Sequence, residues 1–173
     1  NSAGDTLWTK TIGTLQTDNI ECIRLLADGF IMAGSTGFDG YIVKTDTFGT
    51  VLWSKSYGGI RADDFHNVET TTGGGFIASG TSSSFGGSTD TLPNMWLTRT
   101  NSTGDTLWSR VFGGQRHEHG YSGQQTSDGG YIIAGFASSF GYNFWDDGYI
   151  VKTDASGNVS NHLTYTTVLD IVS

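Results

Sequence analysis

Charge is scarce in this 173-residue chain, and so are several other residue types. Charged residues make up 15% of the sequence, against roughly 25% in an ordinary soluble domain. Proline occurs once. Cysteine also occurs once, which excludes an internal disulfide and a cysteine-rich zinc site. Nine Lys and Arg stand against 17 Asp and Glu, which leaves no basic stripe for a nucleic acid. No apolar run approaches the ~18 residues of a membrane-spanning helix.

Glycine and aromatic residues are abundant instead. The 26 glycines are about double the usual share of ~7%, and aromatic residues reach 13%. Together with many Ser and Thr, this composition argues against a helical bundle and against a disordered tail. It favours an all-β protein with many tight turns. The length fits one domain, or a piece of a larger one.

An internal repeat organises the sequence. A Gly-x-x-Leu-Trp-Thr/Ser-Lys/Arg segment occurs at Gly4–Lys10, Gly49–Lys55 and Gly104–Arg110. In each copy an acid follows, at Asp18, Asp63 and Glu118. Apolar runs then recur at 30–34, 76–80 and 131–135, and Tyr/Trp-rich runs at 41–46, 96–101 and 149–154. Because these landmarks keep the same order, the repeat predicts one structural unit for each copy.

Each repeat is typical of four short strands. Runs rich in Val, Ile, Thr, Tyr, Phe and Trp are bounded by Gly, Asp, Asn and Ser. Asp28-Gly29 and Asp128-Gly129 are favourable hairpin turns, and Asp46–Gly49 and Asp154–Gly157 are further tight turns. A four-stranded antiparallel meander that recurs every 45–55 or so residues is the mark of a β-propeller blade.

The motifs Leu-Trp-Ser-Lys-x-Tyr-Gly-Gly, Asp-Gly-Gly-Tyr-Ile-x-Ala-Gly and Tyr-Ile-x-Lys-Thr-Asp-x-x-Gly resemble kelch-like β-propeller repeats of large secreted bacterial proteins, including type IX secretion cargo. The resemblance implies that the innermost strands lie near 20–27, 65–72 and 121–127. We therefore expect three propeller blades at 18–57, 63–112 and 118–165. Residues 5–13 would be an outer strand without a blade of its own, and 166–173 a tail or a further strand.

Three blades are too few for a closed ring, because propellers have at least about four. We expect the chain to be part of a larger propeller. In the alternative, two copies pair into one ring and Asp5–Gly13 completes the partner's last blade. The outer strand at 158–165 is the weakest of the predicted strands, since Asn161 replaces the repeated tryptophan.

The loops of one blade face hold the candidate binding residues. Insertions at 81–94 and 137–147 vary in length while the repeat around them is kept, which is typical of loops that carry binding. Rings beside carboxylates suit a carbohydrate or a protein partner; equally, these rings could fold back on their own blade. The predicted binding residues are Arg61, Asp63, Asp64, Arg116, His117, His119, Phe140, Tyr142, Phe144, Trp145 and Asp146.

Metal and cofactor sites are weaker hypotheses. His117, Glu118 and His119 could ligate a metal, but no further ligand is evident, so no metal site is predicted. Asp39, Asn94 and Asp147 could supply oxygens to calcium, which needs six to eight or so of them; capping of turns explains them more economically. Apart from that calcium, no cofactor is expected. The tryptophans Trp8, Trp53 and Trp108 recur once per repeat and are expected to pack between blades.

The leading functional hypothesis is a non-catalytic propeller scaffold, secreted or at the cell surface, that binds glycan or protein through its loops. One alternative is a glycoside hydrolase or lyase with its site at the propeller axis, built from acids among Asp63, Asp64, Glu118, Asp146 and Asp147. Another is a structural spacer within a large adhesin or filament.

Overall fold

The computed structural model describes residues 2–86, 92–140 and 145–160. Every regular element in these ranges is a β-strand, and no helix that could cross a membrane occurs among them. The strands are β1 (Asp18–Leu26), β2 (Gly29–Thr36), β3 (Asp39–Thr45), β4 (Val51–Tyr57), β5 (Asp63–Thr70), β6 (Phe76–Ser82), β7 (Asn94–Thr100), β8 (Thr106–Phe112), β9 (Glu118–Gln125), β10 (Tyr131–Ala137) and β11 (Asp147–Thr153).

The strands form three antiparallel meanders in chain order. The first sheet has the order β1-β2-β3-β4, the second β5-β6-β7-β8 and the third β9-β10-β11. The all-β prediction is thereby confirmed. Residues 5–13 form no strand, contrary to the predicted outer strand, because they pair with no neighbour among the described residues. Of the predicted outer strand at 158–165, residues 158–160 are not in a strand, and 161–165 lie outside the described ranges, as does 166–173.

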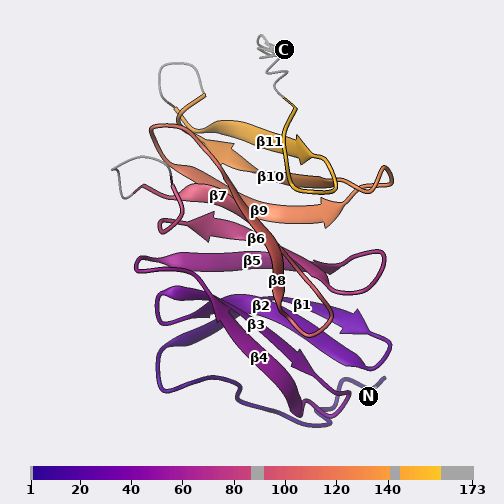
Figure 1. Ribbon diagram of the computed structural model, residues 1–173. Helices are drawn as coiled ribbons and strands as arrows, with labels where there is room; N and C mark the ends of the chain where they lie inside the picture. Colours follow the sequence, from indigo (N-terminus) through magenta and orange to yellow (C-terminus); the bar gives the residue numbers. More distant parts are fainter. Residues whose placement is uncertain (1, 87–91, 141–144, 161–173) are drawn as a thin grey trace, which may run out of the picture.

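The sheets lie one above another in an open stack, with the first sheet at one end and the third at the other (Figure 1). In the second sheet, β6 and β7 are buried along their whole length because neighbours cover both faces. Their alternating side chains therefore enter two different cores. One core joins the first two sheets around Ile31, Ile42, Phe65 and Trp96. The other joins the second and third sheets around Ile77, Leu97, Ile133 and Val151.

The repeated tryptophans pack between neighbouring parts of the stack, as predicted. Trp53 of the first sheet meets Phe76 of the second at a ring-centroid distance of 6.0 Å, and Trp108 of the second meets Tyr131 of the third at 5.1 Å. Trp8 meets Phe30 of the first sheet at 6.4 Å. The segment before β1 therefore makes the same aromatic contact that β4 and β8 make with the sheets that follow them.

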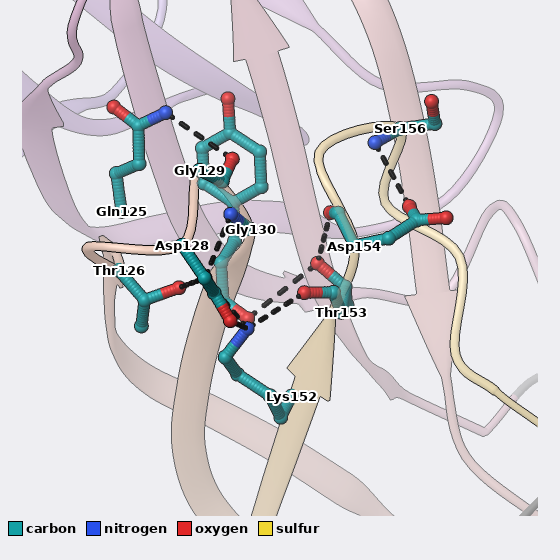
Figure 2. Close-up of polar contacts among 10 residues, drawn as sticks. Gln125, Thr126, Asp128, Gly129, Gly130, Lys152, Thr153, Asp154 and Ser156 are labelled. Carbon is teal, nitrogen blue, oxygen red and sulfur yellow. Dashed lines mark hydrogen bonds and ion pairs between the residues drawn. The ribbon is translucent and has the colours of Figure 1, made fainter.

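Aspartates close the turns at one end of the sheets. Asp46 Oδ1 accepts hydrogen bonds from the backbone N–H groups of Phe48 and Thr50, both at 2.8 Å. Asp154 accepts in the same way from Ser156 at 2.8 Å (Figure 2). Figure 2 also shows the ion pair between Lys152 of β11 and Asp128 in the turn between β9 and β10. The Lys152 Nζ and Asp128 Oδ2 atoms are 2.8 Å apart. These contacts fix the hairpins that hold the strands in register.

A bulge interrupts the first strand of every sheet at the same place. The register shifts between Ile20 and Cys22 in β1, between Phe65 and Asn67 in β5, and between Gly120 and Ser122 in β9. The extra residue in each strand has no partner opposite it in the ladder. These three residues are Glu21, His66 and Tyr121, and the bulge places them at equivalent points of successive sheets.

Candidate functional site

The bulge residues begin a line of polar and aromatic side chains that crosses the stack. Two residues earlier in the same strands stand Asn19, Asp64 and His119, again at equivalent positions. We call the six residues the first-strand row: Asn19, Glu21, Asp64, His66, His119 and Tyr121. Each comes from a strand at one edge of its sheet, so the row follows three successive sheet edges.

His66 joins the first two sheets within the row. Its Nδ1 lies 2.5 Å from Glu21 Oε2 of β1, and its Nε2 lies 3.3 Å from Asp64 Oδ2 of its own strand. Asn19 Nδ2 donates to the other Glu21 oxygen at 3.0 Å. The imidazole is thus held between two carboxylates from different sheets, and both acids remain partly open to solvent.

Aromatic rings continue the row onto the third sheet. The Tyr121 ring lies 5.5 Å from the His66 ring and 6.0 Å from Phe136 of β10. The His119 ring stacks on the same Phe136 ring. Their centroids are 4.8 Å apart and the interplanar angle is 20°. Tyr121 is 51% exposed, so part of its surface is open to solvent. The row therefore presents carboxylate acceptors at one end and ring surface at the other.

Partial burial changes the acid–base behaviour of the middle of the row. Burial raises the pKa of the Asp64 carboxyl above its ordinary value, an effect that the nearby His66 and His119 oppose. Burial lowers the pKa of the His119 imidazole, and the negative charge of Asp64 opposes that shift. Both groups are thus moved toward their neutral forms by the same loss of water.

Glu21, Asp64 and His66 could also offer ligands to a metal. One atom of each lies within 4.8 Å of the others. However, the two ring nitrogens of His66 face different carboxylates, whereas a transition metal needs three or four converging ligands. The three side chains therefore pair with one another in this arrangement.

Two of the predicted acids support the protein's own backbone. Asp63 is buried at the start of β5 and accepts hydrogen bonds from the Gly59 N–H at 2.9 Å and from the hydroxyls of Ser82 and Ser84. Glu118 is buried at the same position of β9 and accepts from the Gly114 N–H at 2.9 Å. Asp18 accepts from Thr14 at 2.7 Å. The repeated acid therefore closes the loop that enters each sheet.

The other predicted binding residues lie at the same end of the sheets as these acids. The backbone N–H groups of Arg61 and Arg116 donate to Ser84 and Ser139, which ties each entry loop to the insertion beside it. His117 is exposed; Asp146 accepts a hydrogen bond from Ser138 at 2.5 Å. Phe140 packs on Tyr149 at 5.0 Å, and Trp145 is exposed. Tyr142 and Phe144 lie outside the described residues.

The predicted binding residues thus divide between two places. Asp64 and His119 belong to the first-strand row, while the remaining described ones surround the loops. The calcium hypothesis named residues that the structure distributes over three sheets: Asp39 begins β3, Asn94 begins β7 and Asp147 begins β11. Asp39 instead faces the next sheet, where burial and the charge of Asp63 raise its pKa.

Sequence reasoning missed Glu21, His66 and Tyr121. They stand at the same position in each repeat, but their residue types differ, so a search for repeated residue types does not find them. The available signal is a polar or aromatic residue three places after the repeated acid in an otherwise alternating strand. No protein-family model matches the chain, and no curated protein is significantly similar to it.

Proposed function

We propose that the protein is a non-catalytic binding module of β-propeller blades, outside a bacterial cell, and that the first-strand row binds a glycan. The three sheets are the blades in this proposal, and the kelch-like resemblance of their repeats supports both the propeller and the location. The observation that carries the binding function is that bulges in the first strands of three successive sheets bring carboxylates, imidazoles and an exposed tyrosine onto one continuous line.

The chemistry of the row suits a sugar. Hydroxyl groups would donate to Glu21 and Asp64, and the apolar face of a sugar ring would lie on Tyr121. The His66 bridge fixes the Glu21 carboxylate before a ligand arrives, so little ordering would be required on binding. The length of the row, which crosses three sheets, favours an extended oligosaccharide over a monosaccharide.

A glycan array with the whole chain tests the proposal. Tyr121→Ala is expected to weaken binding at least tenfold because it removes the exposed ring; Phe48→Ala, which removes an exposed ring from the β3–β4 turn, is the matched control and should bind normally. Loss of binding in Trp145→Ala with full binding in Tyr121→Ala would place the ligand on the loops instead. Absence of binding to any glycan would leave the protein-partner and spacer hypotheses.

One observation favours a glycosidase as the second candidate. Oxygens of Glu21 and Asp64 lie within 4.8 Å of each other, close to the carboxyl separation of about 5–5.5 Å in retaining glycosidases. Hydrolysis of an array ligand that disappears in Glu21→Gln would support this candidate. Asp63 and Glu118 are poorer candidates than Glu21 because backbone N–H groups already occupy their carboxylates.

A further inference from the structure

Apolar side chains are exposed on both end faces of the stack, at positions that are buried inside it. On the first sheet, Ile23 is 53% exposed, whereas Val68 at the equivalent position of β5 is fully buried against the first sheet. On the third sheet, Ile150 is 65% exposed, whereas the equivalent Ile42 and Leu97 are fully buried against the following sheet. The two end faces therefore match the two sides of the interfaces within the stack.

The segment before β1 already has the position of a fourth strand. Besides its contact with Phe30, Trp8 lies over Gly49, as Trp53 lies over Gly104 and Trp108 over Gly157. β4 and β8 make these contacts while each pairs with the third strand of its own sheet. Residues 6–12 make them without pairing to any strand among the described residues.

The third sheet has the complementary feature. β3 pairs with β4 and β7 pairs with β8, but within the described ranges β11 pairs with β10 alone. Gly4–Lys10 repeats the sequence of Gly104–Arg110, which contains the strand that pairs with β7. Figure 1 shows that β11 and the segment before β1 lie at opposite ends of the stack, so within this open stack they are too far apart to pair.

We propose that a second copy of this chain docks head to tail on these faces, with residues 6–12 of each copy adding to β11 of the other as its fourth strand. The register of β7 with β8 places Thr98 opposite Ser109, so Val151 would lie opposite Thr9 of the second copy. Ile150 of one copy would then be covered by the face that carries Ile23 in the other. Each copy supplies both faces, and a head-to-tail contact forms a closed ring when the rotation between neighbours closes and an open chain when it does not; the proposal is that it closes at two copies.

The first-strand row is also continuous across such an interface. Within one copy, the bulge residue of each sheet meets that of the next: Glu21 meets His66, and His66 meets Tyr121. At the new interface Tyr121 would meet Glu21 of the second copy, where a phenol O–H can donate to a carboxylate. Tyr121 and Glu21 belong to both proposals, but the docking experiments change Ile23, Ile150, Thr9 and Val151 instead, so failure of docking and failure of glycan binding are distinguishable.

Mass measurement by light scattering during gel filtration is the first test. The expected mass is twice the chain mass of 18.5 kDa, with a monomer appearing on dilution. A monomer at every accessible concentration would overturn the proposal.

Variants distinguish head-to-tail docking from other dimers. Ile23→Lys and Ile150→Lys alter exposed side chains, so both should fold, and each alone should shift the protein to monomer. An equimolar mixture of the two should regain dimer, because one wild-type interface forms between unlike copies. Ile60→Lys, in an exposed loop position before β5, is the control and should remain dimeric. Loss of dimer in Ile23→Lys with none in Ile150→Lys would indicate a symmetric contact and overturn the proposal.

Cross-linking tests the strand register. In a Cys22→Ser background, Thr9→Cys protein mixed with Val151→Cys protein should form a disulfide-linked dimer of the two variants under mild oxidation. Each variant alone should cross-link far less. Absence of the mixed disulfide from a mixture that remains dimeric would refute the strand addition.

Discussion

At the scale of single residues, the buried acids decide how each sheet begins. Asp63 accepts two hydroxyl donors and a backbone N–H while shielded from water. Asp63→Ala would leave these donors without an acceptor, and hydrogen bonds to a charged group contribute about 1.5–3 kcal/mol. We expect a loss of about 2 kcal/mol or more in unfolding free energy by urea titration. Asp63→Asn, which keeps an acceptor oxygen, should lose less; an equal loss in both would contradict this account.

A histidine in the row makes stability depend on pH. The folded-state pKa of His119 is lowered from its ordinary value of 6.5, so the unfolded chain binds a proton that the folded protein resists. Above about pH 6.5 the imidazole is neutral in both states and does not reduce the free energy of unfolding. As the pH falls below that value, the unfolded chain takes up the proton first, and the free energy of unfolding decreases. The groups that act on it are Asp64, His66, His117 and Asp146.

His119→Gln is expected to remove part of this decline. Urea titrations of both proteins between pH 7.5 and roughly pH 5 should give unfolding free energies that converge, or cross, as the pH falls. Since every other ionisable residue is present in both proteins, the difference between the two curves reports His119 together with its effect on the pKa of Asp64. A constant difference over this range would show that His119 does not titrate as the structure indicates.

At the scale of the elements, a glycine turn determines how closely successive sheets approach. Gly104 has a φ of 80°, and a Cβ there would lie 2.9 Å from the Trp53 ring. Gly129 has a φ of 83° but nothing within 4 Å of such a Cβ. Both Ala variants carry the strain of a positive φ, about 1–2 kcal/mol. Gly104→Ala also forces the Trp53 ring away, a further cost of about 1–3 kcal/mol.

Thermal unfolding of these two variants checks that comparison. Gly129→Ala should lower the melting temperature modestly, and Gly104→Ala should lower it clearly more. Equal shifts would mean that Trp53 moves aside without cost and that the turn does not set the spacing of the sheets.

The same elements show how far the sequence predicts the structure. The repeated apolar runs and the Gly-containing turns between them predicted all eleven described strands, because hairpin pairing depends on local turn chemistry and on a period of two. The same repeat also predicted a strand at 5–13, which the structure does not show. The bulges are invisible to that pattern, since an extra residue changes the register without changing the composition. The contact between Glu21 and His66 of neighbouring sheets could therefore not be predicted from the sequence.

At the scale of the whole molecule, equivalent residues differ by whether a neighbour covers them. Ile42 and Ile150 have the same side chain at the same position of two sheets, yet the first is fully buried and the second is 65% exposed. Ile42→Ala should therefore cost about 2–5 kcal/mol of unfolding free energy. In an isolated chain Ile150→Ala should cost far less, since surface substitutions usually stay within about 0.5 kcal/mol.

Docking of a second copy changes the cost of Ile150→Ala but not the cost of Ile42→Ala. If Ile150 is covered by another chain, the cost of Ile150→Ala rises with protein concentration, because association stabilises the folded state by mass action. The cost of Ile42→Ala stays constant, since its core lies within one chain. Urea titrations of both variants at a dilute and a high concentration separate these cases. A cost for Ile150→Ala that stays small at both concentrations would mean that this face of the third sheet is open to water in the assembled protein.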